Sequence, residues 1–183
     1  YYASLGLMDE DGILRNTEYT RYNVRASIDA DLAQNLKFSI NFAGNYSDRM
    51  WPGLSFKTQS EFSPITQAYY GVPCVAAEYN GLPLGFTNGT YTYNSGAALD
   101  TGYQNQESYR AEISSKLEYD FKALKPLQGL KASVFFGYNY LHTTDRNLLE
   151  SYQLYKYNPN DQSVIQQTSL GISETGFNRS SSL

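Results

Sequence analysis

The sequence YNVRASIDADLAQNLKFSINF, Tyr22 to Phe42, alternates between apolar and polar residues on both sides of a short break. Before the break the even positions carry apolar or small side chains, such as Val24 and Ile28, and the odd positions carry polar ones, such as Arg25. A period of two gives an extended strand two chemically different faces, whereas a helix would scatter the same apolar residues around its axis. The alternation resumes after the break, so the stretch predicts a β-hairpin.

The same period recurs elsewhere in the chain and predicts further strands. The opening residues and a stretch near Phe177 alternate over short lengths, and two longer segments alternate well. Between the longer two, KALKPLQG contains Pro126 and Gly129, which interrupt strand pairing and predict a turn. The additional predicted strands are Tyr1 to Leu7, Tyr109 to Phe121, Leu130 to Tyr140 and the segment around Phe177.

The predicted connections are short at one end of the strands and long at the other. Short links lie at 33–35 and 123–128, and long ones at 8–18, at 49–106 and after residue 145. A membrane β-barrel sorts its connections in this way, with short turns on one side and long loops outside. A soluble β-sandwich could produce the same alternation, but it has no reason to sort loops by length. The pattern favours an antiparallel transmembrane barrel segment and leaves the sandwich as the alternative.

Strand length and aromatic placement also favour the barrel. Tyr19 to Leu32 would extend about 45 Å at ~3.3 Å per residue, far beyond the common globular strand of about 5–6 residues. Tyr22 and Tyr46 fall toward the long-loop end, and Tyr119 and Phe121 fall toward the short-turn end. Aromatic girdles occupy these two levels in membrane barrels.

The polar parity of the strands is expected to face a lumen and to form cross-strand charge pairs. Each exposed pair would contribute at most about 1 kcal/mol. The residues expected to take part are Arg21, Arg25, Asp29, Asp31, Arg110, Glu112, Lys116, Glu118 and Asp120.

The composition narrows the possible functions. The chain has 183 residues, a net charge of -4 and 17% charged residues, a balance that gives no support to nucleic-acid binding. It carries 18 Tyr and 9 Phe but one cysteine, Cys74, so an internal disulfide framework and a multi-cysteine metal site are excluded. No apolar run approaches the ~20 residues of a membrane helix. Because residue 1 opens inside a predicted strand, we expect the chain to be a piece of a longer protein.

Three stretches of the chain carry a family resemblance. The first, Tyr1 to Arg49, contains YYASLG, an acidic Gly turn, an RYN strand and an NLK turn, and the other two run from Ser63 to Leu99 and from Lys116 to Tyr140. The first resembles the barrel region of SusC/RagA-like TonB-dependent outer-membrane transporters, and the other two resemble that family's following outer loop and its next strand pair. The family often has an aromatic residue at Leu7 and a glutamine at Glu10, which are mild departures.

The resemblance implies roughly five to six strands of a plugged barrel of about 22 strands, in the outer membrane of a Bacteroidetes-type bacterium. It implies import of oligosaccharides, with peptides as the alternative, beneath a SusD-like lipoprotein lid. Energy would come through a TonB complex, contacted by parts of the parent protein that are expected to lie outside residues 1–183. A soluble carbohydrate-binding sandwich and a barrel with an enzymatic or purely structural role remain rival interpretations.

No catalytic constellation, metal site or cofactor motif is predicted. His142 shares the parity of Tyr138 and Tyr140, which indicates an interfacial ring more than a base or a ligand. The DEDG sequence, Asp9 to Gly12, lacks the spaced ligands of a calcium loop and predicts a plain turn.

Binding chemistry is expected in the long extracellular loop 51–106. A loop of this length is usually functional or disordered. Its aromatic rings and amides suit sugars, which offer apolar C–H faces and outward hydroxyl groups; packing of the rings within the loop is the alternative. The predicted substrate-binding residues are Trp51, Tyr69, Tyr70, Tyr79, Asn80, Phe86, Asn88, Tyr91 and Tyr93, with Asn94 as a further amide.

Overall fold

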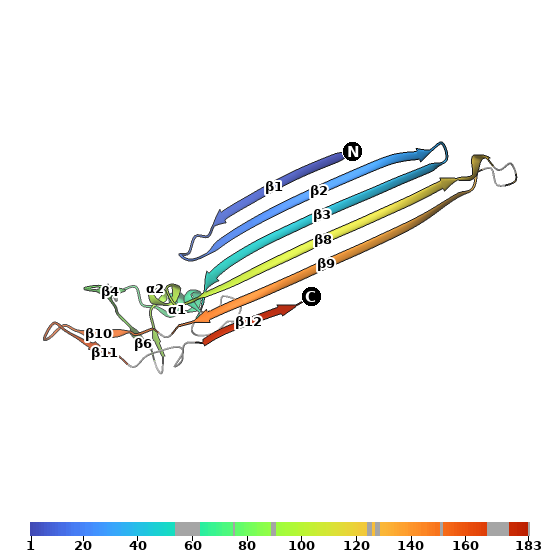
Figure 1. Cartoon of the computed structure of the whole chain (residues 1–183). Coiled ribbons are helices and arrows are strands. Elements are labelled where there is room, and N and C mark those ends of the chain that lie inside the picture. The colour runs from blue at the N-terminus through green and yellow to red at the C-terminus, as the bar shows by residue number, and fades with distance from the viewer. Residues whose placement is uncertain are drawn as a thin grey trace.

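One large antiparallel sheet dominates the computed structural model, and its strands run side by side along the molecule (Figure 1). The structure describes residues 1–53, 63–74, 76–88, 91–123, 126, 129–150, 152–167 and 176–182. Neighbouring strands of this sheet all pair antiparallel, which confirms the all-β antiparallel architecture that the alternation predicts. In sheet order, the strands are β1 (Tyr2–Asp11), β2 (Glu18–Ala33), β3 (Leu36–Pro52), β8 (Tyr103–Asp120), β9 (Lys131–Leu149) and β12 (Gly176–Ser182).

The predicted hairpin is formed by β2 and β3, which are joined by a tight turn and pair Ile28 with Ile40. Several strands run further toward the long-loop end than the alternation indicates. β1 stays paired until Asp11 meets Glu18, so the predicted turn at Asp9 to Gly12 is wrong and the connection narrows to 12–17. Ladder hydrogen bonds join backbone groups, so pairing continues after the apolar alternation stops.

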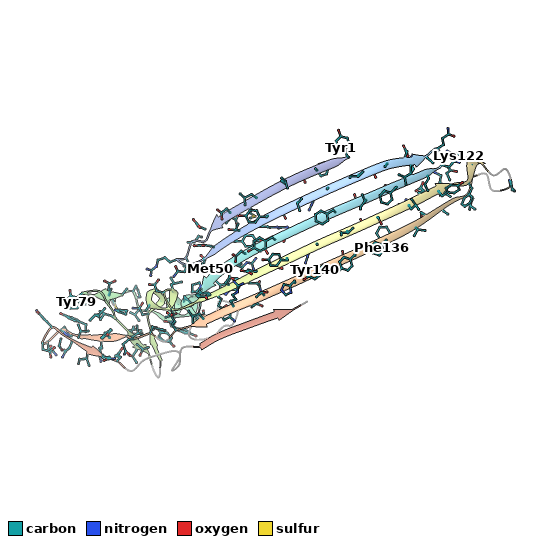
Figure 2. All side chains as sticks on the ribbon, in the orientation of Figure 1. Tyr1, Met50, Tyr79, Lys122, Phe136 and Tyr140 are labelled. Atoms are coloured by element: carbon teal, nitrogen blue, oxygen red, sulfur yellow. The ribbon has the colours of Figure 1, made fainter. Side chains whose placement is uncertain are left out.

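The two faces of the sheet differ in chemistry along most of its length. In one row across the strands, Ile28, Ile40 and Phe136 occupy the same face, and the next row toward the short-turn end carries Phe38 and Val134. These side chains are far from buried: Ile28 is 51% exposed and Val134 is 69% exposed. Figure 2 shows side chains standing off the long strands β1, β2, β3, β8 and β9. A contiguous apolar surface of this extent marks an interaction with a membrane or with another protein.

Smaller elements collect at the long-loop end of the sheet (Figure 1). A 3₁₀ turn at Phe121–Ala123 lies at the opposite end, between β8 and β9. No helix in the described ranges is long and apolar enough to cross a membrane. The elements at the loop end are α1 (Pro64–Tyr70), β4 (Glu78–Tyr79), β5 (Leu82–Pro83), β6 (Phe86–Asn88), β7 (Tyr91–Tyr93), α2 (Ser95–Leu99), β10 (Tyr155–Asn158) and β11 (Ser163–Gln166).

Among the described residues, the buried apolar side chains lie at this same end. Leu154 and Ala98 are fully buried, and Leu84 and Tyr93 are nearly so. We call the described residues of 12–17, 63–102 and 152–167 the outer loop unit, and the six-stranded sheet the wall. The outer loop unit therefore has a small core of its own, whereas the wall exposes its apolar face.

Candidate functional site

Two of the predicted binding residues, Tyr69 and Tyr70, end helix α1. The helix begins at Pro64, and the Ser63 hydroxyl caps it by accepting a hydrogen bond from the Thr66 backbone N–H at 3.2 Å. The Tyr69 and Tyr70 rings meet edge to face at 5.4 Å, and the Tyr70 ring stacks on Tyr93 at 5.7 Å. Tyr69 is 84% exposed, so its ring is open to a ligand, whereas Tyr93 is buried beneath Tyr70.

Tyr79 and Asn80 lie in the hairpin formed by β4 and β5. Asn80 has a φ of 52° and Gly81 a φ of 78°, the left-handed pair that a tight hairpin turn requires. The Tyr79 ring packs against Tyr157, with the ring centroids 4.6 Å apart. The positive φ gives Asn80 a backbone role in the turn. The contact between the Tyr79 and Tyr157 rings joins the hairpin to the loop after β9.

The β6–β7 hairpin holds three more of the predicted residues. Phe86 pairs with Tyr93, and Asn88 pairs with Tyr91 through the backbone. The side chains of Asn88 and Tyr91 lie outside the described part of the chain. Phe86 and Tyr93 line a cavity of about 380 Å³ together with Gln67 and Leu84. Its volume falls within the range of small-molecule sites.

Trp51 lies near the end of β3, which carries it on the polar face of the wall. Its indole N–H donates to the Gln104 side-chain oxygen, and the Gln104 amide donates to the Gly53 carbonyl at 2.9 Å. The Arg49 guanidinium lies 5.0 Å from the Tyr19 ring centroid and 5.9 Å from that of Trp51. Such stacking of arginine on aromatic faces is a favourable cation–π arrangement.

The sequence reading missed Tyr19, Arg49 and Gln104 as neighbours of Trp51. It took the strand to stop before Trp51, whereas β3 continues to Pro52. The i, i+2 spacing of Arg49 and Trp51 was the available signal, because it places both side chains on one face of a strand.

Asn94 is the central polar residue of the outer loop unit. Its side-chain oxygen caps α2 by accepting from the Ala97 N–H at 2.9 Å, and its amide donates to the Ala77 and Leu84 carbonyls, both at 2.8 Å. Its backbone N–H donates to the Gln67 side chain at 2.9 Å. The three side-chain bonds commit the Asn94 amide to the loop scaffold and leave it little capacity for a sugar.

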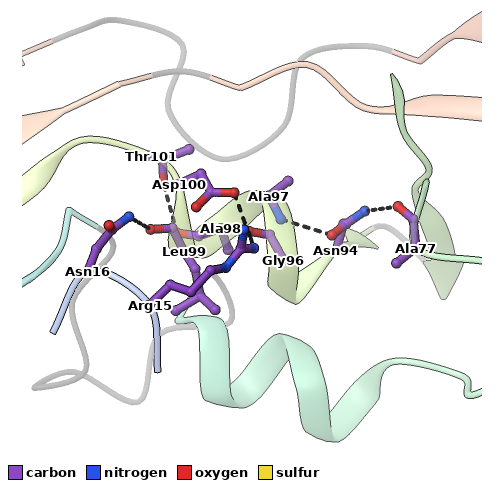
Figure 3. A network of polar contacts seen from close by, with 10 residues as sticks. All are labelled: Arg15, Asn16, Ala77, Asn94, Gly96, Ala97, Ala98, Leu99, Asp100 and Thr101. Atoms are coloured by element: carbon purple, nitrogen blue, oxygen red, sulfur yellow. Dashed lines mark hydrogen bonds and ion pairs between the residues drawn. The ribbon is translucent and has the colours of Figure 1, made fainter. Parts of the chain in front are cut away.

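The β1–β2 connection contacts the end of α2 within the outer loop unit, as Figure 3 shows. Arg15 forms an ion pair with Asp100 at 3.2 Å. Asn16 donates from its amide to the Leu99 carbonyl at 3.0 Å, which satisfies one free carbonyl at the helix end. This contact joins residues that lie more than eighty positions apart in the chain.

The segment after β9 belongs to the same unit, which the sequence did not reveal. Leu84 bridges to Tyr155, and the Gly85 N–H donates to the Tyr155 carbonyl at 2.8 Å. Gln67 donates to the Tyr152 hydroxyl at 3.1 Å, and burial raises the pKa of this phenol, which keeps it protonated at neutral pH. Residues from all three outer connections, including Arg15, Asp100 and Tyr152, line a polar cavity of about 430 Å³.

The arrangement of the described residues offers aromatic rings and amides for binding. Within the described ranges, no group of three or more His, Cys, Asp or Glu side chains could hold a metal ion. His142 stacks near Tyr140 and Tyr109 at 6.5 Å each, in the aromatic position that its parity predicts.

Comparison with known proteins gives one informative similarity. No protein-family model matches the chain. The chain is 26% identical over 152 residues to TonB-dependent receptor P3 of Formosa agariphila. The match covers 76% of this chain and 14% of the receptor, so the chain spans a small part of that protein's length. This similarity supports a relationship to TonB-dependent receptors and does not single out the SusC/RagA group.

Proposed function

We propose that the chain is a wall segment, with its outer loops, of an outer-membrane TonB-dependent importer of oligosaccharides. The protein moves a solute and makes or breaks no bond. In the parent protein, a SusD-like lipoprotein covers the outer loops, and segments outside these residues contact the TonB complex. The relationship to a TonB-dependent receptor supports the class, and the apolar band on the wall supports the membrane location.

The height of the apolar band is the main observation that supports the proposal. A row of rings, Tyr22, Tyr46, Tyr109 and His142, crosses the wall, with Tyr22 and Tyr46 at 6.0 Å and Tyr46 and Tyr109 at 4.7 Å. From Leu36 at the turn end to Tyr46, β3 advances about 33 Å at ~3.3 Å per residue. With a strand tilt of about 40°, the band is about 25 Å tall, the height of the lipid-facing band in outer-membrane barrels.

The apolar band is bordered by polar side chains at the loop end of the wall and by aromatic rings at the turn end. Beyond the upper ring row, the same face becomes polar: Asn105 donates to Asp48 at 2.5 Å, and Arg146 pairs with Glu107 at 2.8 Å. At the turn end, Tyr119 and Phe121 meet edge to face at 4.8 Å. A soluble sandwich would cover its apolar face without a reason for polar and aromatic borders at a bilayer's spacing.

Sugar contacts are proposed at the outer loop unit. The predicted residues Trp51, Tyr69, Tyr70, Tyr79, Asn80, Phe86, Asn88, Tyr91 and Tyr93 remain candidates for contacting substrate. The exposure of Tyr69 and Tyr70 favours these two, because their rings can stack on the C–H face of a sugar without rearrangement.

Spin labels test the membrane location on the full-length protein in bilayers. Labels at Val24 and Ile113 on the apolar face are expected to be protected from a hydrophilic quencher, while labels at Ser27 and Ser114 on the polar face are reached by it. Full quencher access at Val24 and Ile113 would refute a lipid-facing wall.

Growth of a strain lacking the parent gene, on a panel of purified glycans and peptides, tests the substrate class. Loss of growth on a glycan supports oligosaccharide import. Loss on peptides alone favours the peptide importer, and a parent gene without a plug or TonB-contacting segment excludes active import.

A further inference from the structure

Four arginines occupy consecutive levels on the polar face of the wall. The strand register places Arg49 beside Tyr19, Arg21 beside Ser47, Arg110 beside Asn45 and Arg25 beside Ala43. These pairings define four successive rows of the polar face, each about 6.6 Å below the last because side chains on one face repeat every second residue. We call Arg49, Arg21, Arg110 and Arg25 the arginine ladder.

None of the four has an ion-pair partner in the part of the chain that the structure describes. Lysines at the turn end of the same face behave differently. Lys116 pairs with Glu118 at 2.9 Å, Lys131 reaches the same carboxylate at 3.8 Å, and Lys37 lies 3.9 Å from Asp31. Cross-strand pairing is therefore confirmed for Asp31 and Glu118, whose partners are Lys37 and Lys131, whereas Lys116 pairs with Glu118 within β8. It is wrong for the predicted arginines Arg21, Arg25 and Arg110, which have no carboxylate within ion-pair distance in the described residues.

Carboxylates are present on the ladder rows but do not neutralise them. Asp145 accepts a hydrogen bond from the Gln106 amide at 2.7 Å. Glu10, on β1, shares the row of Arg49, and Glu112, on β8, shares the row of Arg25. Four arginines thus share these rows with three carboxylates, in a chain whose net charge is -4. The four rows together therefore carry one net positive charge in a chain that is negative as a whole.

Two of the arginines are held in defined orientations. The Arg21 Nε–H donates to the Asn23 side-chain oxygen at 2.9 Å, and one terminal nitrogen lies 3.1 Å from the Asn45 amide. Arg49 lies over the Tyr19 and Trp51 rings in a recess of about 370 Å³ that they line with Glu10. A guanidinium fixed in this way loses less side-chain entropy when it binds an anion.

We propose that the arginine ladder is a track for anionic groups on the transported oligosaccharide, such as carboxylates or sulfates. The proposal rests on the proposed function and adds the charge class of its substrate. Guanidinium groups bind carboxylates and oxyanions through paired N–H bonds, and rings of arginine and lysine select anions in membrane pores. The ladder begins at Arg49, whose guanidinium lies over the rings of Tyr19 and Trp51 at the loop end of the wall.

An acidic segment from elsewhere in the parent protein is the competing occupant. The ladder position favours a solute, because Arg49 and Arg21 lie on the loop side of the row that contains Tyr22 and Tyr46. This level is the entrance that a substrate would reach first. An internal partner would instead make the arginines contribute to the stability of the folded protein.

Binding measurements on the full-length protein in detergent test the proposal. The probes are trigalacturonate and its neutral methyl ester, and a sulfated heparin tetrasaccharide and its desulfated form. The variant Arg21→Gln/Arg110→Gln removes two ladder charges, and Lys37→Gln/Lys116→Gln removes two paired charges from the other half of the same face.

A charged probe is expected to bind at least tenfold more tightly than its neutral form, with affinity that falls as salt rises. The arginine variant should lose about tenfold in affinity for the charged probe and nothing for the neutral one, and the lysine variant should match the wild type. Equal affinity for charged and neutral probes, or an unchanged arginine variant, overturns the proposal. A lower melting temperature with unchanged affinity also overturns it and assigns the ladder to an internal partner.

The outcomes separate this proposal from the proposed function. Binding of neutral oligosaccharides only would overturn the anionic track and leave oligosaccharide import standing. Binding of no probe, together with normal growth of the deletion strain on every glycan, would overturn both.

Discussion

The wall and the outer loop unit bury their side chains in opposite ways. The wall presents apolar residues such as Ile28 outward, while the outer loop unit folds around Leu154 and Ala98, both fully buried. The wall gains its order from backbone pairing across long strands, and the outer loop unit gains it from a small core and polar bonds around Asn94. This contrast fits the proposed membrane location of the wall, because hydrocarbon favours outward apolar groups and water favours inward ones.

The largest effect is expected from a charged side chain placed on the apolar face of the wall. Ile28→Arg should destabilise the full-length protein by roughly 2–4 kcal/mol, because the charge would lie near the bilayer midplane. Ser27→Arg, one residue away on the polar face, should cost less than about 1 kcal/mol, although it removes a hydrogen bond to Asn41. Equilibrium unfolding into lipid vesicles measures both, and equal losses would contradict the assigned faces.

A somewhat smaller effect is expected at the polar centre of the outer loop unit. Asn94→Ala removes a helix cap and two amide donors, which should cost about 2–3 kcal/mol locally. Hydrogen exchange should rise in 63–74 and 152–167 and stay unchanged in β2 and β3. Asn94→Asp keeps the oxygen that caps α2 but loses the donors to Ala77 and Leu84, so it should fall between the wild type and Asn94→Ala.

Two glycine substitutions compare the cost of an added side chain at the junction of the wall and the outer loop unit with its cost inside that unit. Gly102 has a φ of 55°, and an added Cβ would lie 2.0 Å from the Leu148 carbonyl oxygen, so Gly102→Ala should cost about 2 kcal/mol. Gly81 has a similar backbone but open space around it, so Gly81→Ala should cost about 1 kcal/mol. Thermal melts of both variants separate backbone strain from steric contact, and identical shifts would refute a steric contribution at Gly102.

The smallest effect is expected at the fastening between the β1–β2 connection and α2. The Arg15 and Asp100 side chains are 64% and 53% exposed, so their ion pair should contribute less than about 1 kcal/mol and weaken with salt. A double-mutant cycle with Arg15→Ala and Asp100→Ala measures the coupling. A coupling well above this value would show that the fastening is a structural requirement for the outer loop unit.

The sequence predicted much of the wall because its signal is local. Alternation at Val24, Ile28 and Ile40 assigned the strands and the two faces, and residues two apart on a strand always share a face. The strand ends at Asp11 and Pro52 could not be read in this way, since pairing there continues through backbone bonds after the apolar pattern has stopped.

The outer loop unit was predicted only as a long loop rich in aromatic residues. Its short hairpin at Asn80 and Gly81 was visible as a local turn signal, but the contacts of Gln67 with Tyr152 and of Leu84 with Tyr155 join distant segments. No periodicity records such pairings, because they depend on how three connections meet in space.

The sequence by itself determined that this chain forms long antiparallel strands with one apolar and one polar face, because alternation is a property of neighbouring residues. Only the tertiary structure decided which charges on the polar face find partners. The register places Lys37 opposite Asp31, where their charged groups lie 3.9 Å apart, and leaves Arg21 and Arg110 without a carboxylate within ion-pair distance in the described chain. Electrostatic pairing requires side chains to approach within a few ångströms, and that proximity is set by strand register and side-chain orientation.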